Sequence, residues 1–253
     1  MAESSVQSLE RAFDILELLC KSRNGLSIVA LSSQTGLHKS TVHRLLATMC
    51  NRGYVQKDSE TSIYHAGMHI CELGGYITDN MDVIDRAKAP MERLAQQTGE
   101  TIHLVMRDGN DIVYIHKVEG QTGGMRMVSR IGMRRPLYCT GVGKAMLATW
   151  SEEEVKKLWE ESDIQKLTPY TIVDENQFFR EIAKVRKLGY SLDNQENELD
   201  IRCIAVAMKD YSGKANYALS ISVPLSRMTD ERIEQLKEPL LRERDIIASM
   251  LGG

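Results

Sequence analysis

Apolar and polar positions follow a helical period through the start of the chain. Residues 8–21 predict a first helix, for which Ser8 is the expected cap. Its expected inward residues are Leu9, Phe13, Leu16, Leu19 and Cys20. Two shorter amphipathic helices follow within residues 26–54, and the turn Thr35-Gly36-Leu37 joins them.

The second helix of this pair has two chemically distinct faces. Four apolar residues share one face because they recur at i, i+3, i+4 and i+7: Val42, Leu45, Leu46 and Met49. The opposite face and the N-terminal end carry Lys39, Ser40, Thr41, His43 and Arg44. Such a helix fits the major groove of DNA, as the second helix of a helix-turn-helix does. An ordinary helical hairpin with a solvated face would show the same pattern.

A short hairpin is predicted directly after these helices. Residues 54–57 and 62–65 predict two strands, and the polar residues 58–61 predict the turn between them. Three helices followed by a hairpin are typical of a winged helix-turn-helix, which favours DNA binding over a plain helical hairpin. We therefore expect residues 1–66 to form a DNA-binding domain, with Ser27 and Lys57 as additional candidate DNA contacts.

A linker helix is expected over residues 67–80. It contains Gly74-Gly75, and a glycine inside a helix costs about 1 kcal/mol relative to alanine, so this helix is expected to kink or flex. A further amphipathic helix over residues 83–97 opens the second domain.

The hydrophobic period changes to two after Gly99. The predicted strands are 101–108, 111–120, 124–132, 189–194, 201–210 and 216–225. The predicted helices are 142–150, 152–162, 174–188 and 230–250. Because the strands occur mostly in hairpins and the helices are segregated around them, we expect residues 81–253 to form an α+β domain with an antiparallel sheet.

Composition narrows the class of protein without selecting a function. The chain has 253 residues, of which 42% are hydrophobic and 26% charged, as in globular proteins with material for two domains. No apolar run reaches the roughly 18 residues of a membrane span, and the start does not resemble a signal peptide, so we expect a cytoplasmic protein without a membrane partner. The five dispersed cysteines predict neither a disulfide framework nor a metal site, and no cofactor is expected.

The charge distribution permits DNA binding without requiring it. A net charge of −3 excludes a uniformly basic nucleic-acid coat. Residues 1–65 are nearly neutral, but their basic residues gather late: Lys39, Arg44, Arg52 and Lys57. A local basic face can contact phosphates although the total charge is close to zero.

Five segments together resemble the IclR family of bacterial transcriptional regulators. They are VQSLERAFDILELL, GLHKSTVHRLLATMCNRGYV, RRPLYCTGVGKAMLA, RKLGYSLDNQENELDIRCIAVAM and ALSISVP. The resemblance covers nearly the whole chain and departs at His38, where many relatives have proline. It implies a winged-helix DNA-binding domain, a linker helix and a GAF-like effector domain. It also implies a homodimer, or a dimer of dimers, on palindromic operators of double-stranded DNA.

The resemblance further implies a ligand-responsive repressor whose effector is a small organic acid. It is nearest to the branch that senses sugar acids such as 2-keto-3-deoxygluconate. Carried over position by position, the effector site contains Gly124, Met127, Gly141, Val142, Asp193, Ile201, Cys203, Ser220 and Ser222. No catalytic residue is implied.

The chemistry of these residue types agrees with such a ligand. Residues 141–143 open a helix, where free backbone N–H groups can hold a carboxylate. Ser220 and Ser222 lie two apart on a predicted strand, so their hydroxyls share a face. Asp193 would repel an acid group and accept hydrogen bonds from hydroxyls. A sugar acid, or a hydroxy or keto acid, is therefore the hypothesis.

Plain structural roles remain open for several of these residues. Ser220 and Ser222 could be ordinary polar residues of a sheet, and Asp193 could belong to a turn. His103 and His116 lie on adjacent predicted strands, where we expect them to be partly buried and without a metal.

Other function classes also remain open. A phosphate loop is disfavoured, because Tyr138 stands where the first glycine should be and Ala145 follows Lys144. An enzyme would need a nucleophile, for which Cys139 and Cys203 are the candidates, and neither is coupled in sequence to a recognisable His or Asp. An adaptor would use the helix-turn-helix for protein contacts.

Overall fold

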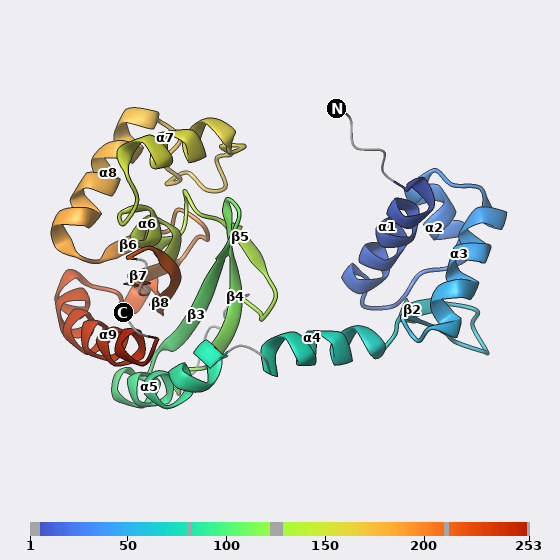
Figure 1. The fold of residues 1–253 in the computed structure, drawn as a ribbon, viewed down its shortest axis with the longest axis horizontal. Coiled ribbons are helices and arrows are strands. Elements are labelled where there is room, and N and C mark those ends of the chain that lie inside the picture. Colours follow the sequence, from blue (N-terminus) through green and yellow to red (C-terminus); the bar gives the residue numbers. More distant parts are fainter. Residues whose placement is uncertain (1–5, 80–81, 122–128, 210–212, 252–253) are drawn as a thin grey trace. The chain divides into compact units, whose positions relative to one another are not determined.

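The computed structural model describes residues 6–79, 82–121, 129–209 and 213–251, and Figure 1 traces its course. The chain divides into two compact units, Met1–Asn80 and Met81–Gly253, and each is described by itself. Within the described ranges, no helix is both long enough and apolar enough to cross a membrane.

The first unit is a winged helix-turn-helix followed by a further helix. Its elements are α1 (Gln7–Lys21), α2 (Ile28–Thr35), α3 (Lys39–Asn51), β1 (Val55–Lys57), β2 (Tyr64–Ala66) and α4 (His69–Asp79). The two strands are antiparallel, with Val55 opposite Ala66 and Lys57 opposite Tyr64. The predicted helices and hairpin are thus confirmed. Leu26 also bridges Tyr64, which ties the segment before α2 to the hairpin.

The inward face of α1 differs from the predicted one. Ile15 and Leu19 are buried in the core of the unit, whereas Leu9 and Phe13 are 53% and 54% exposed. The prediction was wrong because α1 carries apolar residues on two faces, and one face alone packs against α2 and α3. Ser8 does not cap the helix, since α1 already begins one residue earlier and has no side-chain cap.

The second unit is an α+β domain built on one antiparallel sheet, as predicted. Its strands, in spatial order, are β5 (Arg134–Pro136), β4 (Asp111–Val118), β3 (Thr101–Asp108), β8 (Ala215–Pro224), β7 (Ile201–Lys209) and β6 (Ser191–Asn194). Its helices are α5 (Asp82–Thr98), α6 (Gly141–Leu147), α7 (Glu152–Glu161), α8 (Glu175–Leu188) and α9 (Asp230–Met250), with a 3-10 turn η1 (Leu225–Arg227) before α9.

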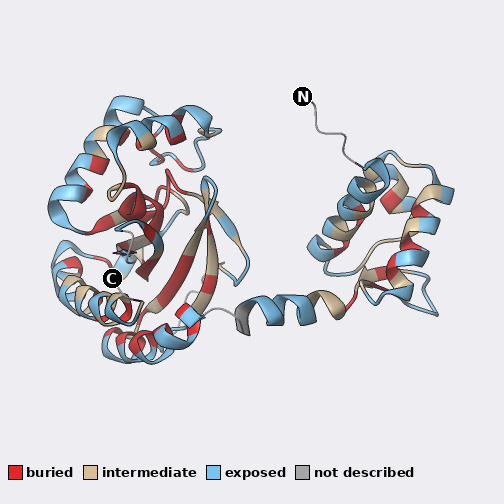
Figure 2. Cartoon of the chain, in the orientation of Figure 1, coloured by how far each residue is buried: buried red, intermediate tan, exposed pale blue. Residues whose placement is uncertain are grey.

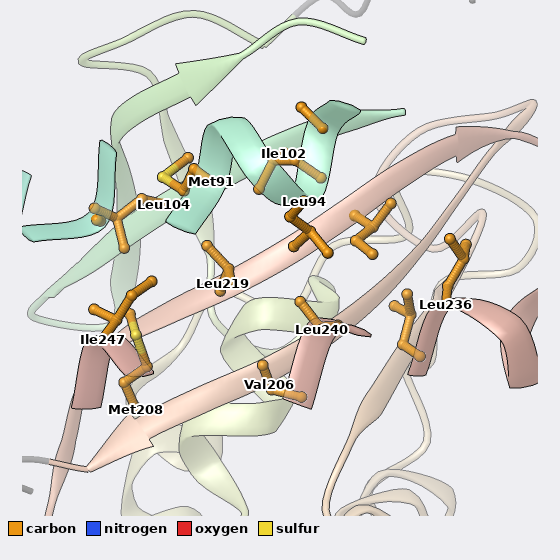
Figure 3. Packing of buried hydrophobic residues seen from close by; sticks show 14 of the residues in the cluster. Met91, Leu94, Ile102, Leu104, Val206, Met208, Leu219, Leu236, Leu240 and Ile247 are labelled. Carbon is orange, nitrogen blue, oxygen red and sulfur yellow. The ribbon is translucent and has the colours of Figure 1, made fainter. Parts of the chain in front are cut away.

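Helices cover both faces of this sheet, and buried residues fill the space between the layers (Figures 1 and 2). On one face, α5 and α9 pack on the sheet, and Figure 3 shows Met91 and Leu94 of α5 with Leu240 of α9 in that cluster. On the other face, α6, α7 and α8 form a second cluster. Successive side chains of β7 point to opposite faces of the sheet, so Val206 packs in the first cluster and Ala205 in the second.

One predicted strand is placed differently. Of the stretch predicted as a strand over 124–132, residues 124–128 lie outside the described part, and the remainder is not a strand. The edge strand is instead β5, in which Pro136 pairs with Asp111. A strand of three residues is too short to show a hydrophobic period, so the sequence did not reveal it.

Candidate DNA-binding surface and effector site

The outward face of α3 presents the predicted DNA-reading residues. These polar residues are exposed or half-exposed on the first turns of the helix: Lys39, Ser40, Thr41, His43 and Arg44. Apolar residues anchor the opposite face in the core: Val42, Leu46 and Met49. Among the described residues, the Arg44 guanidinium has no ion-pair partner, so it is available to a phosphate or a base edge.

The helix before α3 is fixed at both ends. The Ser27 hydroxyl oxygen accepts a hydrogen bond from the Ala30 backbone N–H at 3.2 Å, which caps α2. Gly36 ends α2 in the left-handed region with φ 69°, a conformation that favours glycine. Ser27 therefore has a structural role in addition to its predicted contact with DNA.

The hairpin presents Lys57 on a turn built by Asp58. The Lys57 ammonium lies 5.8 Å from the centroid of the Tyr64 ring, and the residue is exposed. Asp58 Oδ1 accepts hydrogen bonds from the backbone N–H groups of Thr61 at 2.8 Å and Glu60 at 2.9 Å. These bonds hold the pKa of Asp58 below its usual value. The turn thus has a defined geometry, which places a cation at the end of β1.

In the second unit, a small cavity lies between the sheet and the start of α6. Predicted effector-site residues that line it are Gly141, Val142, Asp193, Ile201, Cys203, Ser220 and Ser222. Lining residues that were not predicted are His103, Tyr114, Ser129, Thr140, Asn197 and Glu198. Gly124 and Met127 lie outside the described residues. The cavity encloses about 30 Å³.

A chain of hydrogen bonds crosses this cavity through Ser222. The Ser222 hydroxyl lies 3.1 Å from Cys203 Sγ and 3.1 Å from His103 Nδ1. His103 Nε2 lies 2.7 Å from the Ser129 hydroxyl. The Tyr114 ring packs edge-on against the imidazole, with centroids 5.1 Å apart. The two contacts of Ser222 arise because β8 lies between β3 and β7 in the sheet.

The side chains that form this series of hydrogen bonds are uncharged. Burial lowers the pKa of His103 to about 3, and Lys117 adds to the effect. Burial also raises the pKa of the Cys203 thiol well above its usual value. A neutral imidazole donates from one nitrogen and accepts at the other. These hydrogen-bonded side chains can therefore bond to either a hydroxyl or a carboxylate of a ligand.

Asp193 of β6 places a buried carboxyl group at the cavity wall. Its Oδ1 accepts hydrogen bonds from the backbone N–H groups of Glu196 at 2.8 Å and Asn197 at 3.4 Å. Burial nevertheless raises the pKa of Asp193 to about 7, against the lowering effect of Lys144. The protonation of this carboxyl group therefore changes near neutral pH.

The start of α6 forms the adjoining part of the wall, since a Cβ added at Gly141 would lie 3.4 Å from Asp193 Cβ. Thr140 caps the helix, and its Oγ1 accepts a hydrogen bond from the Gly143 N–H at 3.1 Å. In the part of the chain that the structure describes, the backbone N–H groups of Gly141 and Val142 have no partner. The Leu137 carbonyl oxygen would lie 2.1 Å from a Cβ added at Gly143, so glycine alone fits there.

Lys144 of α6 is fully buried and forms an ion pair with Glu196. A Glu181 oxygen lies 3.9 Å from its ammonium. The lysine is thus bound to carboxylates of the protein, which agrees with the absence of a phosphate-loop pattern. The described residues contain no group of His, Cys, Asp and Glu side chains suited to a metal ion.

His103 shows why the sequence missed part of this site. It was expected to lie partly buried near His116, but it is 2% exposed and pairs with Lys117, while His116 pairs with Leu104. A bulge between Leu104 and Val105 shifts the register, which no periodicity reveals. The available signal was a polar residue between the apolar residues Ile102 and Leu104.

Comparison with known proteins places both units in one family. The model described as IclR helix-turn-helix domain matches residues 8–59, and the one described as bacterial transcriptional regulator IclR C-terminal matches residues 75–247. The chain is 38% identical over 248 residues to the HTH-type transcriptional regulator KdgR of Escherichia coli strain K12, covering 98% of this chain and 94% of that protein. It is 36% identical over 248 residues to the DNA-binding transcriptional repressor YiaJ of the same strain, covering 97% and 88%.

A solved structure agrees with these relatives. The crystal structure of the Thermotoga maritima IclR superposes with a TM-score of 0.83 at 32% identity, covering 98% of this chain and 99% of that one. Family models, relatives and fold therefore coincide over nearly the whole chain. The protein belongs to the IclR family of bacterial transcriptional regulators and is a ligand-responsive DNA-binding regulator.

Proposed function

We propose that this regulator is a repressor whose effector is a small hydroxylated organic acid of the sugar-acid class. The acid binds in the cavity beside α6 and alters the affinity of α3 for a palindromic operator. One observation carries the proposal: Ser220, Ser222, Asp193 and the start of α6 converge on one cavity. The similarity to YiaJ, which is named a repressor, supports the direction of control.

The lining suggests how such an acid would be oriented. The partnerless N–H groups of Gly141 and Val142 suit a carboxylate, and the serine hydroxyls with Asp193 suit ligand hydroxyls. The neutral imidazole of His103 is hydrogen-bonded to the Ser222 hydroxyl, so it would orient that hydroxyl toward the ligand. The site is thus polar at both ends, which favours a hydroxylated acid over an apolar one.

Binding would require the cavity to expand. Its volume of about 30 Å³ is close to that of one water molecule, whereas pockets for small molecules usually exceed about 300 Å³. The ligand must therefore displace part of the wall. A ligand that binds the expanded form alone shifts the protein toward it, which supplies the response.

We further propose that α4 relays this change from an effector unit, residues 81–253, to the DNA-binding unit, residues 1–66. Gly74 and Gly75 weaken the helix by about 1 kcal/mol each relative to alanine. A Cβ added at either glycine would meet nothing within 4 Å, so packing does not demand them. Such a glycine pair suits a helix that flexes or kinks.

Two copies of the chain are needed to read a palindrome, because its half-sites lie about 34–36 Å apart per helical turn. Exposed apolar residues in the first unit support self-association. On α1 and before it, Val6, Leu9 and Phe13 are 63%, 53% and 54% exposed. On α4, Tyr76 and Ile77 are 57% and 60% exposed. A homodimer, or a dimer of dimers, would cover such surfaces.

A cysteine-dependent enzyme is the weaker alternative. The thiolate is the nucleophilic form of cysteine, and burial raises the pKa of Cys139 to about 12. Burial also raises the pKa of Cys203, so both thiols stay protonated at neutral pH. The similar proteins are transcriptional regulators rather than enzymes.

Fluorescence anisotropy with a labelled duplex from the protein's own upstream region tests the proposal. The probes are 2-keto-3-deoxygluconate, D-gluconate, D-glucuronate and pyruvate, with uncharged glucose as the control. We expect one acid to weaken operator binding about tenfold or more, which corresponds to a coupling free energy of about 1.4 kcal/mol, and glucose to have no effect.

Calorimetry then locates the ligand. Ser222→Ala should weaken binding of the active acid about tenfold, since it removes a hydrogen bond to a charged or polar ligand. DNA binding that no acid changes would leave a constitutive regulator and contradict the effector proposal. Absence of any duplex binding would favour an adaptor.

A further inference from the structure

A second and larger cavity lies at the other end of α6. Its volume is about 470 Å³, and it is bounded by α6, α8, β7 and α9. The apolar part of its lining is made of small residues: Ala145, Ala148, Val185, Ala207 and Ala248. Small side chains from four separate elements thus leave space where larger ones would pack.

The end of β7 faces this cavity with a free strand edge. β6 pairs with β7 only as far as Ser191 opposite Ala205, so residues 206–209 have β8 on one side and no described strand on the other. Ala207 and Lys209 of this stretch line the cavity. Backbone groups at such an edge are available as hydrogen-bond partners.

The cations around the cavity differ in availability. Arg186 is committed to the protein, because it donates to the backbone carbonyls of Ala148 at 3.2 Å and Trp150 at 2.7 Å. Arg244 donates to Asp245 at 2.6 Å. Lys209 is exposed and has neither an ion pair nor a hydrogen bond among the described residues. Within the described part of the chain, a cation without a counter-ion therefore stands at the rim.

We propose that this cavity is a second ligand site, which takes an amphipathic monocarboxylate. The aliphatic or aromatic body lies on the alanine floor, and the carboxylate binds Lys209, since Arg244 is already paired with Asp245. The cavity volume falls within the range that is usual for small-molecule sites, about 300–1,000 Å³. The walls of such sites are mostly apolar with a few polar groups. The alanine floor suits an apolar body better than a sugar acid, whose hydroxyls would find partners there mainly at Thr149 and the strand edge.

Both cavities depend on the same two elements. α6 contributes Gly141 and Val142 to the effector cavity, and Ala145 and Ala148 to the second. β7 likewise lines both. A ligand that moves α6 would therefore act on both cavities. This coupling rests on the proposed effector site, whereas the proposal of the second site stands without it.

Calorimetry on the full chain tests the site, with octanoate as the probe and 1-octanol as its uncharged counterpart. We expect one octanoate site per chain and about tenfold weaker binding of octanol, the effect of losing one charge-assisted contact. Lys209→Gln should reduce octanoate affinity to that of octanol. Lys209→Arg, which keeps the charge, should retain it.

Two further variants separate this cavity from the effector cavity. Ala248→Phe fills the space and should abolish octanoate binding, whereas Ser220→Ala should leave it unchanged. The proposal is overturned if octanoate does not bind, or if Ser220→Ala rather than Ala248→Phe removes binding. It is also overturned if light scattering shows that Ala248→Phe dissociates an oligomer, since a second copy would then cover this face.

Discussion

Arg44 carries a guanidinium without an ion-pair partner among the described residues, on the exposed face of α3. We expect it to read a base. Arg44→Ala should cost about 1–3 kcal/mol of operator binding and relax the preference at one base pair, because a bidentate contact to guanine is lost. Anisotropy with a set of operator variants measures both effects.

Arg44→Lys is the matched control, since it keeps the charge but not the bidentate geometry. It should lose the base preference while keeping most of the salt dependence of binding. A uniform loss of affinity across all operator variants, for either substitution, would instead assign Arg44 to a phosphate.

Asp193 should make effector binding depend on pH. Its pKa of about 7 means that the carboxyl group is neutral below that value and repels an acid ligand above it. We expect affinity for the effector acid to fall above pH 7, by up to about tenfold per pH unit. The Lys144–Glu196 ion pair and Glu198 are the other charges near this group, and His103 stays neutral. Calorimetry between pH 6 and pH 8.5 measures the slope.

Asp193→Asn should flatten that profile. The same carboxyl group also affects stability: because its folded pKa lies above the ordinary 3.8, the folded state holds a proton that the unfolded chain loses between about pH 4 and 7. The Asp193 carboxyl group therefore stabilises the folded state at low pH, and this contribution to the free energy of unfolding is lost as pH rises through 7. A wild-type urea midpoint that falls no faster than that of the variant over this window would argue against the shifted pKa.

At the scale of elements, the start of α6 is tightly constrained by its neighbours. Gly143→Ala should destabilise the protein by about 1–3 kcal/mol, because the added Cβ would lie 2.1 Å from the Leu137 carbonyl oxygen. Gly74→Ala in α4 is the control, since its Cβ would meet nothing within 4 Å. Urea unfolding should give a lower midpoint for the first variant and an unchanged or higher one for the second.

α1 shows where element prediction by period reaches its limit. Its boundaries were predicted within one residue, but Leu9 and Phe13 were assigned to the core although they are exposed. Amphipathic period identifies a helix locally, and it does not say which of two apolar faces meets the neighbouring helices. The packing of α2 and α3 decides that.

At the scale of the whole molecule, the exposed apolar residues of α1 bear on assembly. Phe13→Gln should weaken the proposed dimer, because burying a phenylalanine side chain contributes about 1.5–3 kcal/mol. Operator affinity should fall with it, since two linked α3 helices bind a palindrome far better than one. Sedimentation and anisotropy measure the two effects on the same samples.

Asp14→Asn, an exposed neighbour on the same helix, is the control and should change neither quantity. A Phe13→Gln variant with an unchanged dimer and unchanged operator affinity would show that another surface holds the two copies together.

The sequence by itself determined most helices and strands of this protein, with β5 as an exception, and the polar face of α3 that we propose reads DNA. Both depend on local spacing: Val42, Leu46 and Met49 lie on one side of α3 because 3.6 residues make a turn, so Lys39 and Arg44 must lie elsewhere. The effector-site serines were also predictable as a pair, since alternate residues of a strand share a face.

Only the tertiary structure decided the composition of the small cavity that we propose as the effector site. His103, Cys203 and Ser222 meet because β8 lies between β3 and β7, an order that no local period encodes. The same assembly buries Asp193, and burial is what brings its pKa near neutrality. Spacing fixes which residues share a face, whereas partners and charge states depend on what the folded chain packs against that face.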